Sequence, residues 1–398
     1  MIAYNLFVAF CLIRVTKAQQ PCPAIPADYA FQPFGSHQIR ELPDPFLSVG
    51  GMRISRKTEW DCRQNELSQL AQAHEYGTVP GPPTSLRSSL NGTTLKIDLD
   101  VTNKTTSFTV SIKYPNSGNA PYPALIVFGS LSIPAPASAA VVIFTSPDEI
   151  ARPGAEPFLR VHTGKFYDLH GRGHSAGTTA ALAWSISRII DALEQTPAAL
   201  IDPKRLGITG CSRFGRATLA AGAFDTRIAL TVVQEAGQGG DACYRLDIDD
   251  QSRYGRCRSM PCPSQSDYGQ GAVFQNFSRN PQMLPFDQHS VAAMIAPRAL
   301  LVIQNLIDWL RPKASFGCMV ATHKVWEALG VPERMAVSQN GAGNHCQFPD
   351  TKADLLGAFV EKFLVGTEGK YAGFNTNVVE STTGITPSWN TWKIPLLD

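Results

Sequence analysis

A short apolar stretch runs into a serine and then, without a break, into a helix-forming segment. Residues 205–216 have the sequence RLGITGCSRFGR, and the residues that follow, ATLAAGAF, favour a helix. Small neighbours let Ser212 occupy the sharp turn between the two, which lifts its hydroxyl clear of the sheet. The N-terminus of the helix then directs free N–H groups toward any oxyanion that develops nearby. The pattern predicts an α/β fold with a nucleophilic serine at a strand-to-helix turn.

A literal G-x-S-x-G pattern surrounds a different serine, Ser175. The residues before it, HTGKFYDLHGRG, are polar and show no strand periodicity, whereas a nucleophile turn needs a strand that leads into it. Around Ser212 the second glycine, Gly215, comes one place late, but the strand is present. We therefore expect Ser212 to be the nucleophile. For Ser175 we expect a structural role, as the N-cap of a helix that begins near Thr178.

Continuous apolar runs alternate with helical patterns through most of the chain. Such runs suit parallel strands that are buried on both faces. They cover residues 124–128, 140–144, 206–209, 230–233 and 300–303. Apolar residues at helical spacing in 182–193 and 319–329 predict helices between these strands. Strict alternation in 95–101 and 108–114 predicts antiparallel strands before them. The expected fold class is α/β: an α/β-hydrolase fold, a three-layer αβα sandwich whose mostly parallel sheet has antiparallel N-terminal edge strands.

The N-terminal residues and the cysteines predict export. An apolar run within the first 15 residues, too short to span a bilayer, precedes small residues that suit signal-peptidase cleavage. We expect residues 1–18 to be a signal peptide and residues 19–398 to form a single catalytic domain of a secreted, extracellular protein. The mature chain then keeps eight cysteines, an even number that indicates disulfides. Sequons at Asn91, Asn103 and Asn276 agree with a secreted glycoprotein.

Charge and cysteine spacing argue against several partners. The formal net charge is +2 with 17% charged residues, which gives no basic stripe for nucleic acid. No segment after the N-terminal run is apolar for long enough to cross a membrane. The one close cysteine spacing, Cys257 to Cys262, lies in a proline-flanked loop and does not suggest a zinc site. We expect a monomer that needs no metal and no cofactor.

A nucleophilic serine needs a base, and the base needs an acid that orients it. In α/β-hydrolases these follow the serine in the order acid, then histidine. His345 lies in a flexible glycine-containing loop after an expected strand, whereas His323 falls within a helical pattern and is expected to be structural. Two acids compete: Glu235 ends the strand after the nucleophile helix, and Asp308 follows the next strand, which is the commoner position. The residues alone favour Asp308 slightly.

Two cysteines adjoin the expected nucleophile and base. Cys211 immediately precedes Ser212, and Cys346 immediately follows His345. A bond between them would hold the two catalytic loops together. Two unrelated cysteines at both places would require a coincidence, so we expect this disulfide.

Several long segments resemble the fungal glucuronoyl esterases (carbohydrate esterase family 15). They are GCSRFGR, QEAGQGGDACYR, MLPFDQHSVAAMIAPRALLVIQNLIDWL, SFGCM and GNHCQFP. The segments LPDPFLSVGG, KFYDLHGRGHSAG and AWSISRIIDALE are also similar. The resemblance runs from about Cys22 to the C-terminus. It implies cleavage, without a cofactor, of the ester that joins 4-O-methyl-glucuronic acid of xylan to lignin alcohols.

The resemblance also implies roles for individual residues. Position by position it makes Ser212 the nucleophile, Glu235 the acid and His345 the base, and so favours Glu235 over Asp308. It implies that Arg213 helps to form the oxyanion hole and that Trp309 lines the sugar site. It further implies three disulfides, which are Cys22–Cys62, Cys211–Cys346 and Cys243–Cys318, and leaves Cys257 and Cys262 to pair locally.

Parts of the chain depart from the family pattern. Phe214 and Arg216 stand where the family usually has asparagine and lysine, and arginine offers a planar fork in place of a point charge. Arg216 lies one helical turn beyond Ser212, so we expect it on the same face, donating to sugar hydroxyls. Residues 246–273 diverge, and Gln265 and Asp267 are the candidates for sugar contacts there. Two alternative functions follow: an esterase of the same fold for other uronate or simple esters, and a carbohydrate-binding protein that has lost turnover.

Overall fold

The computed structural model describes residues 22, 25, 41–152, 162–246, 270–278, 281–341, 343–382 and 392–398. The expected signal peptide (1–18), the Cys257–Cys262 pair and the candidates Gln265 and Asp267 lie outside these residues. None of the helices in the described ranges has both the length and the apolar character that crossing a membrane would require.

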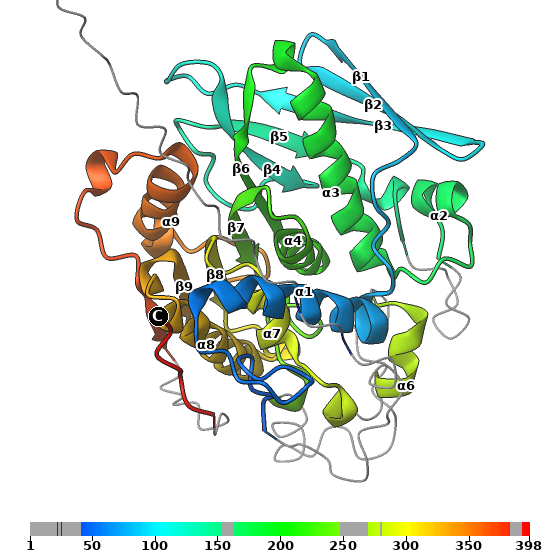
Figure 1. Cartoon of the computed structure of the whole chain (residues 1–398). Coiled ribbons are helices and arrows are strands. Elements are labelled where there is room, and N and C mark those ends of the chain that lie inside the picture. The colour runs from blue at the N-terminus through cyan, green and yellow to red at the C-terminus, as the bar shows by residue number, and fades with distance from the viewer. Residues whose placement is uncertain are drawn as a thin grey trace, which may run out of the picture.

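A ten-stranded sheet forms the centre of the molecule (Figure 1), with the strand order β1-β2-β3-β5-β4-β6-β7-β8-β9-β10. The strands are β1 (Ser85–Asn91), β2 (Thr94–Val101), β3 (Lys104–Lys113), β4 (Tyr122–Phe128), β5 (Ala140–Phe144), β6 (Ile201–Cys211), β7 (Ile228–Gln234), β8 (Ala299–Asn305), β9 (Met335–Asn340) and β10 (Val379–Ser381). From β5 to β10 all neighbours are parallel, whereas β1, β2 and β3 pair antiparallel at one edge. The expected mostly parallel sheet with antiparallel N-terminal edge strands is confirmed.

Helices pack on both faces of the sheet. They are α1 (Trp60–Ala71), α2 (Lys165–His170), α3 (Thr178–Gln195), α4 (Arg213–Phe224), α6 (Gln275–Ser278), α7 (Gln288–Ala293), α8 (Pro312–Ala328) and α9 (Ala353–Phe359). Successive residues of a strand point to opposite faces, so a strand buried on both sides needs apolar residues throughout. In β4, Ile126 joins one buried cluster with α3, α4, α7 and α8, while Leu125 and Val127 join a second with α9. The sheet is therefore the middle layer of three, as the continuous apolar runs predict.

Two edge strands have weak sequence signals. The side chains of β1 are alternately half-buried and exposed, and its sequence, SLRSSLN, has only two apolar residues. The other, β10, has three residues, two of them exposed. An edge strand contributes hydrogen bonds on one side and little apolar surface, so neither strand stands out in the hydropathy pattern.

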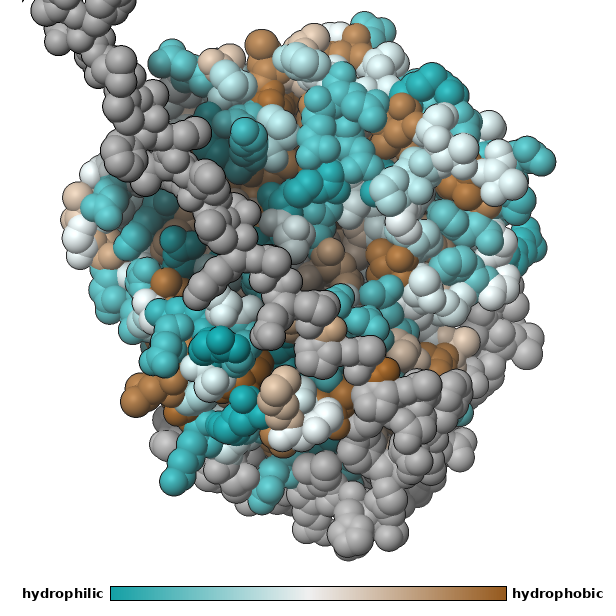
Figure 2. Space-filling model, viewed as in Figure 1, coloured by the Kyte–Doolittle hydropathy of each residue, from teal (hydrophilic) through white to brown (hydrophobic). Residues whose placement is uncertain are grey.

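The surface is mixed in character. In the face shown in Figure 2, most described residues are hydrophilic or intermediate, and hydrophobic ones occur in small groups between them. Trp309 is half-exposed, at 50%, and lies near the carboxyl ends of the parallel strands, just after β8. In open parallel sheets this end is where loops gather to form binding sites.

Candidate active site

Ser212 lies at the junction between β6 and α4. Its backbone has φ 61° and ψ −127°, a left-handed conformation that a non-glycine residue adopts only at some cost. The Ser212 amide donates to the Gln234 carbonyl at the end of β7, 3.0 Å away, which holds the turn against the next strand. This strained strand-to-helix turn is the geometry of a nucleophile elbow.

The glycine that comes one place late has a steric explanation. A Cβ atom on Gly215 would lie 2.7 Å from the Gln234 carbonyl oxygen, so only glycine lets α4 approach β7 this closely. A Cβ on Gly210 would lie 2.8 Å from the Phe214 carbonyl oxygen and from Thr218 Oγ1. Both glycines therefore permit the tight packing of α4 on the sheet that the elbow requires.

Ser175 lies in a different setting. Helix α3 begins at Thr178, as expected, but its N-cap is Gly177, and no side chain caps it. The expected N-cap role of Ser175 is therefore wrong: its hydroxyl instead accepts a hydrogen bond from the Thr78 amide, at 3.1 Å. No strand leads into Ser175, since the preceding element is α2.

Glu235 and His345 form a hydrogen-bonded pair. His345 Nδ1 lies 2.6 Å from Glu235 Oε2, and Glu235 is 2% exposed. The same carboxylate oxygen accepts from the Cys346 amide at 2.7 Å, and Oε1 accepts from Asn305 Nδ2 at 2.5 Å. A carboxylate bound at Nδ1 fixes the imidazole tautomer and leaves Nε2 to accept a proton.

Asp308 does not take this position. It is exposed in a short 3₁₀ turn after β8, and among the described residues no hydrogen bond joins it to His345. His323 lies within α8, where its ring contacts Glu327 and Asn377. The structure therefore pairs His345 with Glu235, whereas Asp308, at the position where this fold more commonly has its acid, is exposed to solvent.

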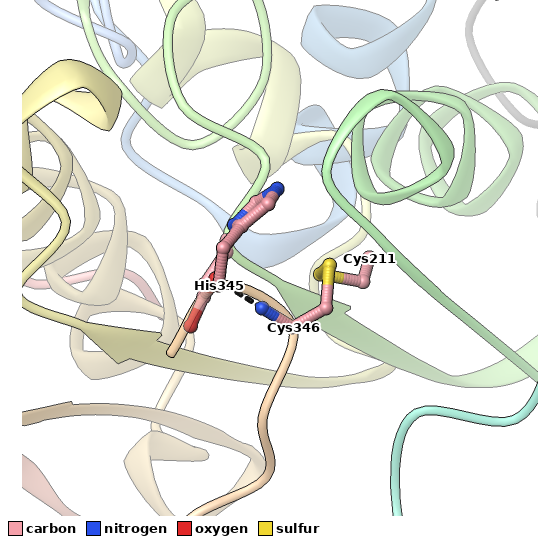
Figure 3. Close-up of side chains that lie close together, drawn as sticks. Cys211, His345 and Cys346 are labelled. Carbon is pink, nitrogen blue, oxygen red and sulfur yellow. Dashed lines mark hydrogen bonds and ion pairs between the residues drawn. A yellow bond between two sulfur atoms is a disulfide. The ribbon is translucent and has the colours of Figure 1, made fainter. Parts of the chain in front are cut away.

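A disulfide joins the nucleophile loop to the histidine loop. Cys211 and Cys346 have an S–S distance of 2.01 Å and link positions 135 residues apart. Figure 3 shows the bond between the end of β6 and the loop that follows β9, with the His345 ring beside it. The expected cross-link is confirmed, as are Cys22–Cys62 and Cys243–Cys318.

The same cluster also gathers donor atoms of the kind that bind metals. Ligand atoms of Cys211, Glu235, His345 and Cys346 lie within 4.8 Å of one another. Both sulfurs are consumed by the disulfide, and the carboxylate is occupied by the hydrogen bonds described above. These atoms are therefore bonded to one another within the cluster, which suits a proton-transfer site better than a metal site.

Asn305 is a site residue that the sequence analysis missed. At the end of β8 its Nδ2 donates to Glu235 and also lies 3.1 Å from the Asn344 carbonyl and 2.8 Å from the Gln347 carbonyl. It therefore connects the acid to the loop that carries His345. In the sequence it comes two residues after the apolar run 300–303, and nothing in the pattern there signals this role.

Arg213 and Trp309 are both exposed side chains next to residues of the cluster: Arg213 follows Ser212 in the chain, and Trp309 contacts His345. The Arg213 side chain is 58% exposed, and its Nη2 lies 2.8 Å from Asp148 Oδ2. The Trp309 ring packs edge-on against the His345 ring, with centroids 4.7 Å apart. An exposed aromatic ring next to the base suits contact with the apolar face of a sugar.

Arg216 is buried, against the expectation of an exposed position beside the nucleophile. It is 8% exposed, and its Nε donates to the Ala236 carbonyl at 3.0 Å, next to Glu235. Helical spacing places the residue one turn beyond Ser212, but the long side chain packs inward beneath the loop that begins with Glu235. The structure shows that Arg216 bonds to the loop that begins with Glu235. A contact between Arg216 and the sugar remains a prediction.

Comparison with known proteins gives a consistent result. A family model described as fungal glucuronyl esterase matches residues 97–330. A 4-O-methyl-glucuronoyl methylesterase of Hypocrea jecorina is 43% identical over 384 residues, which cover 94% of this chain and 79% of that protein. The glucuronoyl esterase catalytic domain from the same organism has a TM-score of 0.82 at 43% identity and covers 90% of this chain and 97% of its own.

A second solved structure includes a bound ester. It is a serine-to-alanine mutant of the glucuronoyl esterase from Sporotrichum thermophile, in complex with methyl 4-O-methyl-β-D-glucopyranuronate. Its TM-score is 0.81 at 38% identity, with 90% of this chain and 96% of that one covered.

Proposed function

This chain belongs to the fungal glucuronyl esterase family of carboxylic ester hydrolases, and we propose that it cleaves the ester between 4-O-methyl-glucuronic acid of xylan and lignin alcohols through an acyl-enzyme on Ser212. The observation that carries the proposal is the Glu235–His345 pair, held beside the Ser212 elbow by the Cys211–Cys346 disulfide. We extend the proposal to secretion, which the three disulfides support.

The first half of the reaction forms the acyl-enzyme. Ser212 Oγ attacks the ester carbonyl carbon while His345 Nε2 takes the hydroxyl proton, and Glu235 stabilises the resulting imidazolium. Negative charge develops on the carbonyl oxygen, where the N-terminus of α4 and the Arg213 guanidinium can stabilise it. The tetrahedral intermediate then collapses, the C–O bond to the alcohol breaks, and His345 returns its proton to the departing alkoxide.

The second half releases the uronic acid. Water enters the place of the alcohol and loses a proton to His345 as it attacks the acyl carbon. Collapse of this intermediate restores the Ser212 hydroxyl with the proton from His345. The reaction needs no redox or metal chemistry, because each step transfers only a proton and an acyl group.

Substrate recognition cannot rest on attraction between opposite charges. An esterified uronate has no free carboxylate, so hydrogen bonds to hydroxyls and the exposed face of Trp309 must orient the sugar. We propose Arg216 as one donor. The crystallised complex of the S. thermophile enzyme with a methyl glucuronate ester supports this substrate class.

A substrate panel tests the proposal. Methyl 4-O-methyl-glucuronate, methyl galacturonate and an aryl acetate should be compared by kcat/KM on the same preparation. The proposal predicts a preference of at least about tenfold for the glucuronate ester, since sites built around hydroxyl hydrogen bonds reject an acetate, which lacks the hydroxyls, and a galacturonate, which presents its C4 hydroxyl in the opposite orientation. Equal rates on all three would favour a general esterase, and no hydrolysis of any would favour a binding protein without turnover.

A further inference from the structure

The Arg213 guanidinium is held at two points although its side chain is exposed. Nη2 lies 2.8 Å from Asp148 Oδ2, and Cζ lies 4.7 Å from the centroid of the Phe214 ring. A long exposed side chain otherwise samples many rotamers, and each rotamer that points elsewhere removes a fraction of the molecules from the reactive arrangement. Two contacts of different kinds on one guanidinium therefore restrict where its charge can lie.

Phe214 is itself firmly placed. Its ring stacks on Phe128, with centroids 5.7 Å apart and planes inclined by 10°. Phe128 is 1% exposed at the end of β4, so the stack connects the sheet core with the surface. Behind it, Gly129 has φ 69°, and a Cβ there would lie 3.2 Å from Phe214 Cε2. The ring is thus a rigid aromatic platform beside the nucleophile.

Asp148 comes from a separate segment, the 3₁₀ turn Pro147–Glu149 that follows β5. Pro147 is buried, and the neighbouring Glu149 pairs with Lys165 of α2 at 2.6 Å, so the turn is anchored independently of Arg213. Its position is therefore set by β5 and α2, while that of Phe214 is set by β4 and α4. Arg213 is held between supports from these two parts of the fold.

We propose that Asp148 and Phe214 are positioning residues for Arg213: they align its guanidinium with the developing oxyanion before the ester binds. This inference rests on the proposed role of Arg213 in the oxyanion hole. Pre-aligned charge stabilises the transition state without a reorganisation cost, and this platform supplies the alignment.

Single variants should lower kcat and leave substrate binding intact. With methyl 4-O-methyl-glucuronate, Asp148→Asn and Phe214→Leu should each reduce kcat about two- to fivefold, the factor expected for one exposed ion pair or cation–π contact, with KM changed by less than about twofold. Phe214→Tyr keeps the platform and should retain kcat. Asp98→Asn is the matched control, because it removes an ion pair with Lys96 on β2 that touches neither Arg213 nor the turn that carries Asp148, and it should leave kcat unchanged.

A double-mutant cycle separates positioning from general structural damage. In an Arg213→Ala background, Asp148→Asn and Phe214→Leu should cause no further loss of kcat, because the group that they position is gone. Melting temperatures of the Asp148→Asn and Asp98→Asn variants should match, since both ion pairs reach the surface.

The outcomes are distinct. The positioning role is overturned if Asp148→Asn and Phe214→Leu lower kcat by the same factor in the Arg213→Ala background. It is also overturned if both single variants keep native kcat while Arg213→Ala itself is impaired. Native kcat in Arg213→Ala would instead remove Arg213 from the oxyanion hole, and with it this inference, while the Ser212 chemistry would stand.

Discussion

At the residue scale, the carboxylate of Glu235 is the most completely bound group of the site. It accepts hydrogen bonds from the His345 ring, the Cys346 amide, and both the amide and the side chain of Asn305. These hydrogen bonds hold the buried carboxylate in one orientation next to the His345 ring. This is the environment that the acid of a catalytic triad needs.

Replacing Glu235 should therefore cost far more than replacing Asp308. Glu235→Gln keeps the shape but removes the charge and disturbs the tautomer of His345, so kcat should fall by roughly 10³- to 10⁴-fold. Asp308→Asn alters an exposed carboxylate and should leave kcat within about twofold. Steady-state kinetics on methyl 4-O-methyl-glucuronate measures both, and a loss confined to Asp308→Asn would contradict the assignment.

Arg216 presents two separable roles. If it donates to sugar hydroxyls as proposed, Arg216→Ala should lower kcat/KM for a glucuronate ester by about 1–3 kcal/mol more than for an acetyl ester. Its bond to the Ala236 carbonyl predicts an additional loss common to both substrates, because that carbonyl adjoins Glu235. The ratio of the two kcat/KM values isolates the sugar contact. An unchanged ratio would leave Arg216 with the structural role alone.

At the element scale, the site is a junction of loops from distant parts of the chain. The Cys211–Cys346 bond joins the end of β6 to the loop after β9, and Asn305 ties the end of β8 to the same loop. Each strand end is fixed by the sheet, so the loops need only short links to bring Ser212, the proposed nucleophile, to Glu235 and His345, the proposed acid and base.

Removing the cross-link should weaken both stability and catalysis. The double variant Cys211→Ala/Cys346→Ala opens a loop closed over 135 residues, and we expect unfolding free energy to fall by roughly 2–5 kcal/mol, with a loss in kcat as the histidine loop gains freedom. Cys22→Ala/Cys62→Ala is the control. It should lower stability and spare kcat, because Cys62 lies on α1, outside the residues of the site. Equal kcat in the two double variants would show that the catalytic loops do not depend on the clamp.

The elements that bury apolar surface are also those that the sequence predicts. Continuous runs such as 124–128 and 300–303 mark β4 and β8, and the strand before Ser212 distinguishes it from Ser175. Polar contacts between distant segments leave no pattern in the sequence. Asn305 contacts the loop that carries His345, and Asp148 contacts Arg213, only because the sheet places the ends of their strands close together. The burial of Arg216 is likewise set by tertiary packing, which helical spacing does not reveal.

At the scale of the whole molecule, a buried acid makes stability depend on pH. Glu75 is 0% exposed, and its Oε1 accepts from Tyr244, Gln270 and Gln288, while Oε2 has no hydrogen-bond partner among the described residues. Burial, together with the nearby negative charge of Asp287, raises the pKa of Glu75 from 4.5 to about 8. Between these values the folded protein keeps a proton that the unfolded chain has released.

Unfolding free energy should therefore decrease as pH rises from about 4.5 to about 8, by up to about 1.4 kcal/mol per pH unit from this group. Burial lowers the pKa of His289 and of His170 to about 4, and it also lowers the pKa of His74 and of His174, which has the opposite effect, mostly below pH 7. Comparison with Glu75→Gln between pH 7 and 8 therefore separates the Glu75 contribution from that of the histidines. Urea unfolding at these two pH values should show a decline for the native protein that Glu75→Gln lacks; parallel declines would exclude Glu75 as the cause.

The account rests most directly on Ser212 as the nucleophile that forms an acyl-enzyme with a glucuronate ester. The decisive measurement is the turnover of methyl 4-O-methyl-glucuronate by folded Ser212→Ala and Ser175→Ala, with folding checked by circular dichroism. We predict a loss of at least about 10³-fold for Ser212→Ala, the usual effect of removing a triad member, and turnover within a few-fold of native for Ser175→Ala. Native turnover by Ser212→Ala, or a loss found only in Ser175→Ala, would contradict the account.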